Sequence, residues 1–197
     1  MIPAHRDAGQ AFPIYITVVA GLLFLALAYL AVGQAAVNRS GAQTAADSAA
    51  LAAAQEERDQ LTDQWREVLL DPTKWQEVFD GNVPLDDPCR RARQLATQND
   101  AALNDCFAAG LLKYEVDVRT NKSVGRSVVP GSEDYRSKAS AIAEVEPLCD
   151  FELPAQDSEG DELPELTCKE KVWRLQPDET TGLPKPEDLF DVHLTDS

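Results

Sequence analysis

Histidine is nearly absent from this 197-residue chain, which contains only His5 and His193. Histidine is the side chain that most often transfers protons in active sites, and it commonly activates a serine or cysteine nucleophile. None lies between these two positions, and no nucleophile stands in a motif with a base. We therefore expect no catalytic residue, no bound cofactor and no enzymatic activity.

Closely spaced cysteines are also missing. Zinc sites usually take cysteines two to four residues apart or add nearby histidines. The four cysteines here follow neither pattern, so the sequence predicts no metal site. They are Cys89, Cys106, Cys149 and Cys168. An even number of widely spaced cysteines indicates disulfides formed in an oxidising compartment.

Three pairings of these cysteines are possible, and the sequential pairing encloses the more coherent units. In one continuous helix Cys89 and Cys106 would lie about 25 Å apart, whereas a disulfide needs Cα atoms roughly 4.4–6.8 Å apart. That bond therefore requires a chain reversal, which Gln-Asn-Asp at residues 98–100 offers. Cys149 and Cys168 enclose two short ordered runs around the acidic loop DSEGDELPE, as in a stapled hairpin.

Basic residues are outnumbered by acidic ones: the chain has 18 Lys and Arg and 34 Asp and Glu, which gives a net charge of −16. The basic run CRRAR at residues 89–93 is short and surrounded by acidic residues, so we expect no binding to nucleic acid. The loop DSEGDELPE lacks the ordered ligand spacing of a calcium loop, which favours a solvated surface.

Charge disappears altogether from Ala8 to Asn38, and residues 14–37 read IYITVVAGLLFLALAYLAVGQAAV. About 20 such residues cross a hydrocarbon core of roughly 30 Å as a helix, so this segment is long enough to span a membrane. A cleaved signal peptide is the alternative, with AVG before Gln34 as its cleavage site. Its apolar core would usually have about 7–15 residues, fewer than are found here, so we predict an uncleaved anchor.

The remaining sequence predicts an α+β fold. Residues 41–70 are strong helix formers, with Leu61, Trp65 and Val68 on one apolar stripe, and DPTKWQEVF starts a second helix at its proline. Alternation in KYEVDVRT and SKASAIAEVEP predicts strands joined across a Pro130-Gly131 turn, and KEKVWRL predicts a third. The tail LPKPEDLFDVHL has room for one short strand.

Three segments follow from these features. Residues 1–9 form a cytoplasmic leader, and residues 10–58 form a transmembrane helix that continues into an alanine-rich stalk. Residues 59–197 form a small extracytoplasmic domain stapled by disulfides, with short helices and an antiparallel sheet. Charge near the span decides the orientation only weakly, whereas the length and the cysteines of the segment after the span place this domain outside the cell membrane, in a single-pass topology.

The N-terminal module resembles a known family. Gly9-Gln10-Ala11, the single span and the run QTAADSAALAAA at residues 43–54 are similar to TadE/TadG-like proteins of the tight-adherence (Flp) pilus assembly system, which resemble type IV pilins at their N-terminus. The resemblance implies a minor pilin-like subunit or accessory protein. It also implies other TadE/TadG-like or pilin-like subunits and pilus platform proteins as partners, in homo- or hetero-oligomers.

The family also implies processing by a prepilin-type peptidase, which cuts after a glycine. Gly9 occupies that place, so the mature chain would begin at Gln10. Its fifth residue would be Ile14, where most pilins carry a glutamate that pairs with a neighbouring subunit's amine. Ile14 removes that docking device.

The alanine-rich stalk has two faces. Arg39, Gln43 and Asp47 recur at four-residue steps as a polar row, whereas Ala45 and Ala49 belong to a face with nothing larger than a methyl group. Small faces let helices approach closely, so we predict a helix-packing interface for a partner. The alternative is a rigid spacer, because alanine is the best helix former. A second function also stays open, a membrane-tethered envelope protein whose acidic outer domain binds an extracellular ligand.

Overall fold

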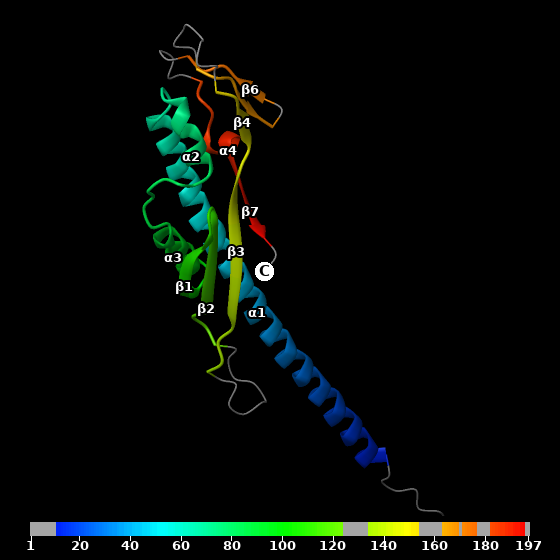
Figure 1. Cartoon of the computed structure of the whole chain (residues 1–197). Coiled ribbons are helices and arrows are strands. Elements are labelled where there is room, and N and C mark those ends of the chain that lie inside the picture. The colour runs from blue at the N-terminus through cyan, green and yellow to red at the C-terminus, as the bar shows by residue number, and fades with distance from the viewer. Residues whose placement is uncertain (1–10, 124–133, 154–162, 170, 177–181, 196–197) are drawn as a thin grey trace, which may run out of the picture.

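The fold is organised around one long helix. A computed structural model describes residues 11–123, 134–153, 163–169, 171–176 and 182–195. Helix α1 (Ala11–Glu67) is 57 residues long, so it spans about 85 Å at 1.5 Å per residue. Its first half projects away from the rest of the chain, and its second half lies along a sheet (Figure 1). We call residues 12–37 the projecting half and residues 42–67 the packed half.

A four-stranded antiparallel sheet covers the packed half. It contains β1 (Ala101–Gly110), β2 (Lys113–Thr120), β3 (Lys138–Pro147) and β7 (Phe190–Thr195), in the order β1-β2-β3-β7. Every second residue of β2 and β3 faces α1, which buries Val116, Val118, Ala141 and Ala143. The alternating apolar residues that predicted these two strands are therefore the residues that pack the sheet against the helix.

Short helix α3 (Cys89–Gln98) packs beside α1 and leads directly into β1. Asn99 caps the helix, and Asp100 reverses the chain with a positive φ of 56°. Asn99 Nδ2 also donates to Ser48 Oγ on α1 at 2.9 Å, which fixes the turn against the long helix. The reversal lies at the predicted place, but the strand that follows it was not predicted.

The far end of the domain is built around aromatic rings. Pro72–Lys74 forms a 3-10 turn that continues into α2 (Trp75–Phe79), as DPTKWQEVF predicted. Trp75 lies between Trp65 and Phe151, with ring centroids 5.7 and 5.2 Å away. Its indole Nε1 donates to the Val68 carbonyl at 3.1 Å. Trp65 and Trp75 are fully buried, so they belong to the core.

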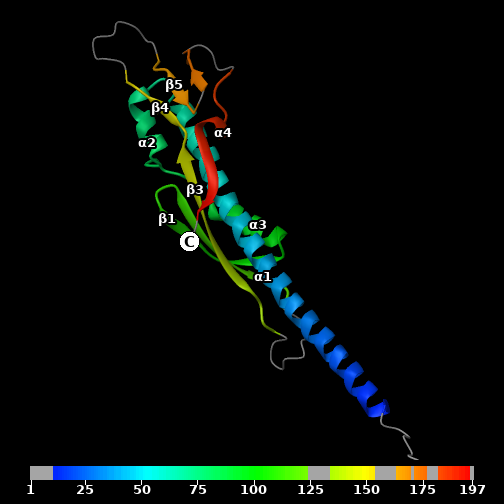
Figure 2. The same cartoon turned by 90° about the vertical axis from the view of Figure 1, so that its right-hand side faces the viewer.

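A second, smaller sheet closes this end. It joins β4 (Cys149–Phe151), β5 (Leu166–Cys168) and β6 (Lys171–Trp173) in antiparallel order. Helix α4 (Pro186–Leu189) then leads into β7, which lies along α1 in the turned view (Figure 2). The α+β class is confirmed. The Pro130-Gly131 turn and most of the acidic loop fall outside the described residues.

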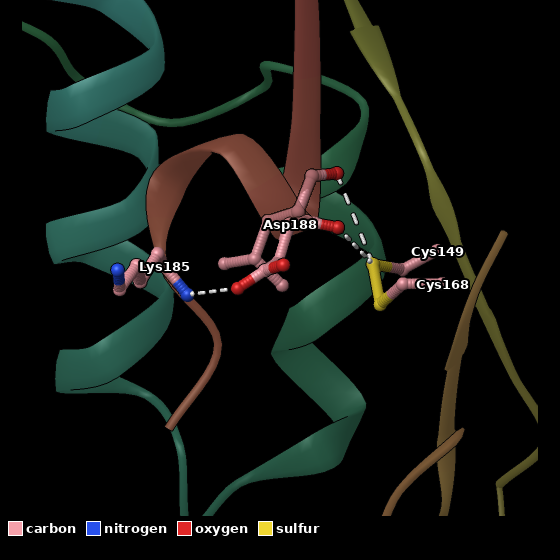
Figure 3. The surroundings of a disulfide bond; sticks show 5 residues. Cys149, Cys168, Lys185 and Asp188 are labelled. Carbon is pink, nitrogen blue, oxygen red and sulfur yellow. Dashed lines mark hydrogen bonds between the residues drawn. A yellow bond between two sulfur atoms is a disulfide. The ribbon is translucent and has the colours of Figure 1, made fainter. Parts of the chain in front are cut away.

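Two disulfides staple the domain. Cys89–Cys106 joins α3 to β1 with a Cα separation of 5.9 Å, and Cys149–Cys168 joins β4 to β5. Figure 3 shows Cys149 Sγ beside the last turn of α4, 3.6 Å from the Asp188 carbonyl oxygen. Asp188 in turn accepts a hydrogen bond from the Lys185 backbone amide at 2.9 Å. The second disulfide thus contacts the turn that leads into β7.

The predicted stalk, residues 10–58, and the predicted domain share one core in the structure. The alanines of α1 from Ala42 onward are part of this buried core. The physical reason is that methyl side chains let the β-sheet approach the helix backbone closely. The packed half of α1 is therefore the central element of the domain.

Replacing Ala49 with Leu should overpack this helix–sheet contact, because Ala49 is fully buried. We expect a loss of about 1–3 kcal/mol in the free energy of unfolding. Ala36→Leu is the matched control, since the same change falls on an exposed position of α1. Thermal unfolding of both full-length variants in detergent measures the difference, and equal melting temperatures would contradict this packing.

Removing the bond between Cys149 and Cys168 with a double serine variant should also destabilise the domain. The loop that it closes spans 19 residues, for which the chain-entropy model gives about 3 kcal/mol. Chemical denaturation of the full-length protein measures the loss. Non-reducing peptide mapping is the accompanying check, and a peptide that links Cys89 to Cys149 or Cys168 would overturn the structure's pairing.

Candidate functional site

The predicted helix-packing interface divides into two sets of residues in the structure. Arg39 is exposed where α1 enters the domain. Gln43 Nε2 donates to Asp47 Oδ1 at 2.8 Å and lies 3.4 Å from the backbone carbonyl oxygen of Ser140 on β3. Two members of the polar row therefore bind each other and the chain's own sheet.

The alanine face, for which the sequence predicted a partner helix, is covered by the chain's own residues in the structure. Ala45 and Ala49 have no exposed surface, and they belong to the core in which α1 packs against α3 and the inner face of the sheet. The sequence pattern showed that this face is small, but a sheet meets that requirement as well as a helix does. A partner of the folded protein must use another surface of α1.

The projecting half of α1 supplies such a surface. It is the one described helix long and apolar enough to cross a membrane, with a mean hydropathy of 2.4 and none of its best window buried. Large apolar side chains stand out all around it, including Phe24 at 70% exposure and Tyr29 at 80%. Such an apolar surface is suited to contact with lipid or with other apolar helices. Gly9 and Gln10, the predicted cleavage site, lie outside the described residues.

Polar contacts fasten the projecting half to the base of the domain. Thr120 Oγ1 donates to Asn38 Oδ1 at 3.1 Å, and Asn38 Nδ2 donates to the Lys122 carbonyl oxygen at 3.3 Å. These bonds join Asn38, the residue after the projecting half, to the last residue of β2 and to Lys122 just beyond it. Sequence reasoning missed them because the partners lie more than 80 positions apart in the chain.

The outer face of the sheet brings three ionisable side chains together. Glu146 and Asp191 are direct cross-strand partners on β3 and β7, and ligand atoms of Glu146, Asp191 and His193 lie within 4.8 Å of one another. His193 Nδ1 is 3.5 Å from Asp191 Oδ2. Such a group has donors that suit a cation, but like charges also meet on exposed sheets without one. His193 Nδ1 is buried and has no hydrogen-bond partner among the described residues, but the His193 side chain as a whole is 41% exposed, so this atom does not establish an ion site. Sequence reasoning predicted no metal.

Comparison with known proteins addresses α1 alone. Residues 9–56 match the family model described as putative Flp pilus-assembly TadE/G-like. The match confirms the resemblance drawn from the same residues, and it supports a role related to Tad pili that is structural rather than enzymatic. No curated protein and no solved structure matches the chain significantly. The TadE/G-like module therefore comprises the projecting half and the alanine-rich part of the packed half.

Glu57 is the first residue after the TadE/G-like module and the only buried acid among the described residues. It is 5% exposed, and its Oε2 has no hydrogen-bond partner there. Burial raises the pKa of Glu57 from its ordinary value of 4.5 to about 7. Burial also raises the pKa of nearby Tyr114 to about 12, with a further contribution from the charges of Glu57 and Asp87. Such a carboxyl costs stability when it is ionised.

This pKa predicts a pH-dependent stability. Below pH 4.5 Glu57 is protonated in both states, and between pH 4.5 and about 7 only the folded state keeps its proton. The free energy of unfolding should therefore fall as pH rises through this window, by about 3 kcal/mol.

Glu57→Gln should remove that fall and leave a more stable domain at pH 8. Glu67→Gln is the control, because Glu67 is exposed on the same helix. Urea unfolding at pH 4, 6 and 8 measures the effect. A pH profile that Glu57→Gln leaves unchanged would show that the carboxyl finds water or a partner.

Proposed function

We propose that this protein is a non-enzymatic, membrane-anchored component of a tight-adherence (Flp) pilus assembly system, acting as a minor pilin-like subunit or accessory protein. One observation carries the proposal: the residues that match the family model form a helix whose first half is exposed and whose second half is buried in the domain. The match includes the whole projecting half, whose apolar side chains have no cover within the described chain. A helix of this kind is suited to contacts inside a bilayer.

The packed half limits how partners can bind. Its alanine face is filled by the sheet, so helix–helix packing with TadE/TadG-like, pilin-like or platform proteins falls to the projecting half. Association between spanning helices depends on close approach at small residues. Gly21 meets this need, because a Cβ added there would contact nothing within 4 Å. The same surface serves homo- and hetero-oligomers.

The proposed topology puts the leader in the cytoplasm and the domain outside. Both disulfides favour this orientation, because such bonds persist in oxidising compartments. Processing between Gly9 and Gln10 is part of the same proposal, and the mass of the mature protein tests it. Ile14 makes the span suited to a minor or accessory subunit, since it offers no carboxylate to a neighbour's amine.

A second function is favoured by the charge of the outer sheet face. Glu115, Asp117, Glu144 and Glu146 point away from α1, because their strand neighbours face it. Lys113, Arg119 and Lys138 share this face, and Lys113 Nζ lies 2.9 Å from Glu144 Oε2, so the acids outnumber the bases only slightly. Such a surface suits a basic extracellular ligand. In that case the protein would be a membrane-tethered envelope protein, and partner helices in the membrane would be dispensable.

A photo-crosslinking residue at position 23 should discriminate between these functions. Leu23 is 60% exposed on the projecting half, and Gln55 is an exposed control position on the packed half. In cells that contain the Tad machinery, we expect protein adducts with TadE/TadG-like or platform proteins from position 23 and about tenfold fewer from position 55. Mass spectrometry of the adducts identifies the partners. Lipid adducts alone, at normal membrane levels, would leave the helix as a tether and favour the ligand-binding function.

A further inference from the structure

A groove is lined by residues of the projecting half of α1 and of the base of the domain. The base is the end of the domain from which α1 projects (Figure 1). The volume of the groove is about 650 Å³ and its lining is mostly apolar. One wall is a single face of α1 that contains Leu30, Gly33 and Val37, at helical spacing. The other wall is the base of the domain, with Asp100 and Lys122.

The depth of this groove follows from the length of α1, and this step rests on the proposed role of α1 as a membrane anchor. About 20 residues cross the hydrocarbon core, so a span that begins near Phe12 ends near Ala31. Tyr29 then lies at the membrane interface, where tyrosine is enriched. The headgroup layer is roughly 5–8 Å thick on each side, which places Gly33 to Val37 within it. The groove therefore opens among the lipid headgroups.

The charges at its rim come as an opposite pair. Lys122 Nζ lies 2.7 Å from Asp100 Oδ2, and the two side chains are 77% and 70% exposed. A surface ion pair this exposed contributes about 0–1 kcal/mol, so it separates at little cost. A headgroup with one phosphate and one primary ammonium offers both charges a partner. Its phosphate accepts from Lys122 Nζ, and its ammonium donates to the Asp100 carboxylate.

We propose that this groove binds the headgroup and glycerol region of a phosphatidylethanolamine molecule in the surrounding leaflet. A phosphocholine group would fit less well, because its quaternary ammonium has no hydrogen to donate to Asp100. A phosphatidylglycerol headgroup would leave Asp100 without a cation. The volume also lies within the range of about 300–1,000 Å³ for sites that bind small molecules.

A helix of a neighbouring subunit fits the groove less well. With its side chains a helix is about 10–12 Å across, which corresponds to on the order of 500 Å³ per turn. The groove has room for little more than one turn, whereas stable helix packing involves several. A bound lipid would fill the space between α1 and the base, and it would hold the domain at a fixed height and tilt on the membrane.

Native mass spectrometry of the full-length protein in detergent tests this proposal, with phosphatidylethanolamine, phosphatidylcholine and phosphatidylglycerol added in equal amounts. We expect about tenfold higher retention of phosphatidylethanolamine than of the other two. Gly33→Phe should abolish that preference by filling the groove, because a Cβ at Gly33 meets nothing within 4 Å and the side chain can be accommodated. Ala20→Phe is the control on the same helix outside the groove, because Ala20 is exposed and does not line it, and this variant should retain the lipid within twofold of the unmodified protein.

Two further variants test the charges. Asp100→Asn should lower phosphatidylethanolamine retention to the phosphatidylcholine level, and asparagine tolerates the positive φ of this position. Lys122→Gln should weaken all three phospholipids. Equal retention of the three by the unmodified protein, or equal effects of the two phenylalanine variants, would overturn the proposal. If the unmodified protein forms a dimer in place of a lipid adduct, and Gly33→Phe dissociates that dimer, then a second copy of the chain occupies the groove and the proposal is overturned.

Membrane extraction separates this inference from the proposed function. Protein that resists carbonate extraction but shows no lipid preference would refute the groove alone. Protein that carbonate releases from membranes would refute the anchor, and the groove with it. Unfolding temperatures of all variants show whether a lost adduct reflects lost folding.

Discussion

The contact between the alanine face of α1 and the inner face of the sheet is the constraint on which the rest of the structure depends. Methyl side chains on the helix meet small and β-branched residues on β2 and β3, so the backbones of the two layers lie close together. Each small residue buries little area, and the layer is stabilised by their number and continuity. A larger side chain in the middle of this contact would separate the sheet from the helix over several residues. Because the sheet is bound to one side of α1, the helix cannot swing relative to the domain without breaking the core.

This constraint divides α1 into two parts with opposite surroundings. The packed half has its apolar face covered by protein, whereas the projecting half has apolar side chains on every side. Because α1 is continuous through both halves, the direction of the packed half in the domain also fixes the direction of the projecting half. The hydrogen bonds of Asn38 to the end of β2 lie where the surroundings change. At the opposite end, the aromatic cluster around Trp75 and the Cys149–Cys168 bond close the domain.

Local sequence patterns predicted the elements that repeat over many residues. KYEVDVRT predicted β2 with its observed bounds, and the reversal at residues 98–100 followed from the geometry that a disulfide requires. Strand β1 was missed because AALNDCFAAG is rich in residues that favour helices or turns. It is a strand because its backbone pairs with β2 and because Cys106 is tied to α3. The occupant of the alanine face could not be predicted for a similar reason. Gln43 lies 97 positions before Ser140, and a local pattern carries no information about such a contact.

The charge distribution explains why the junction between α1 and the domain differs from the rest of the surface. The chain has a net charge of −16, and the carboxylates on the outer sheet face point away from α1. An acidic domain held against an anionic membrane would be repelled over a Debye length of about 8–10 Å. At the base, however, Lys122 is paired with Asp100, and the nearby Arg39 is the first charged residue after the span. The base is therefore less negative than the chain as a whole, which suits the proposed position of the domain next to lipid headgroups.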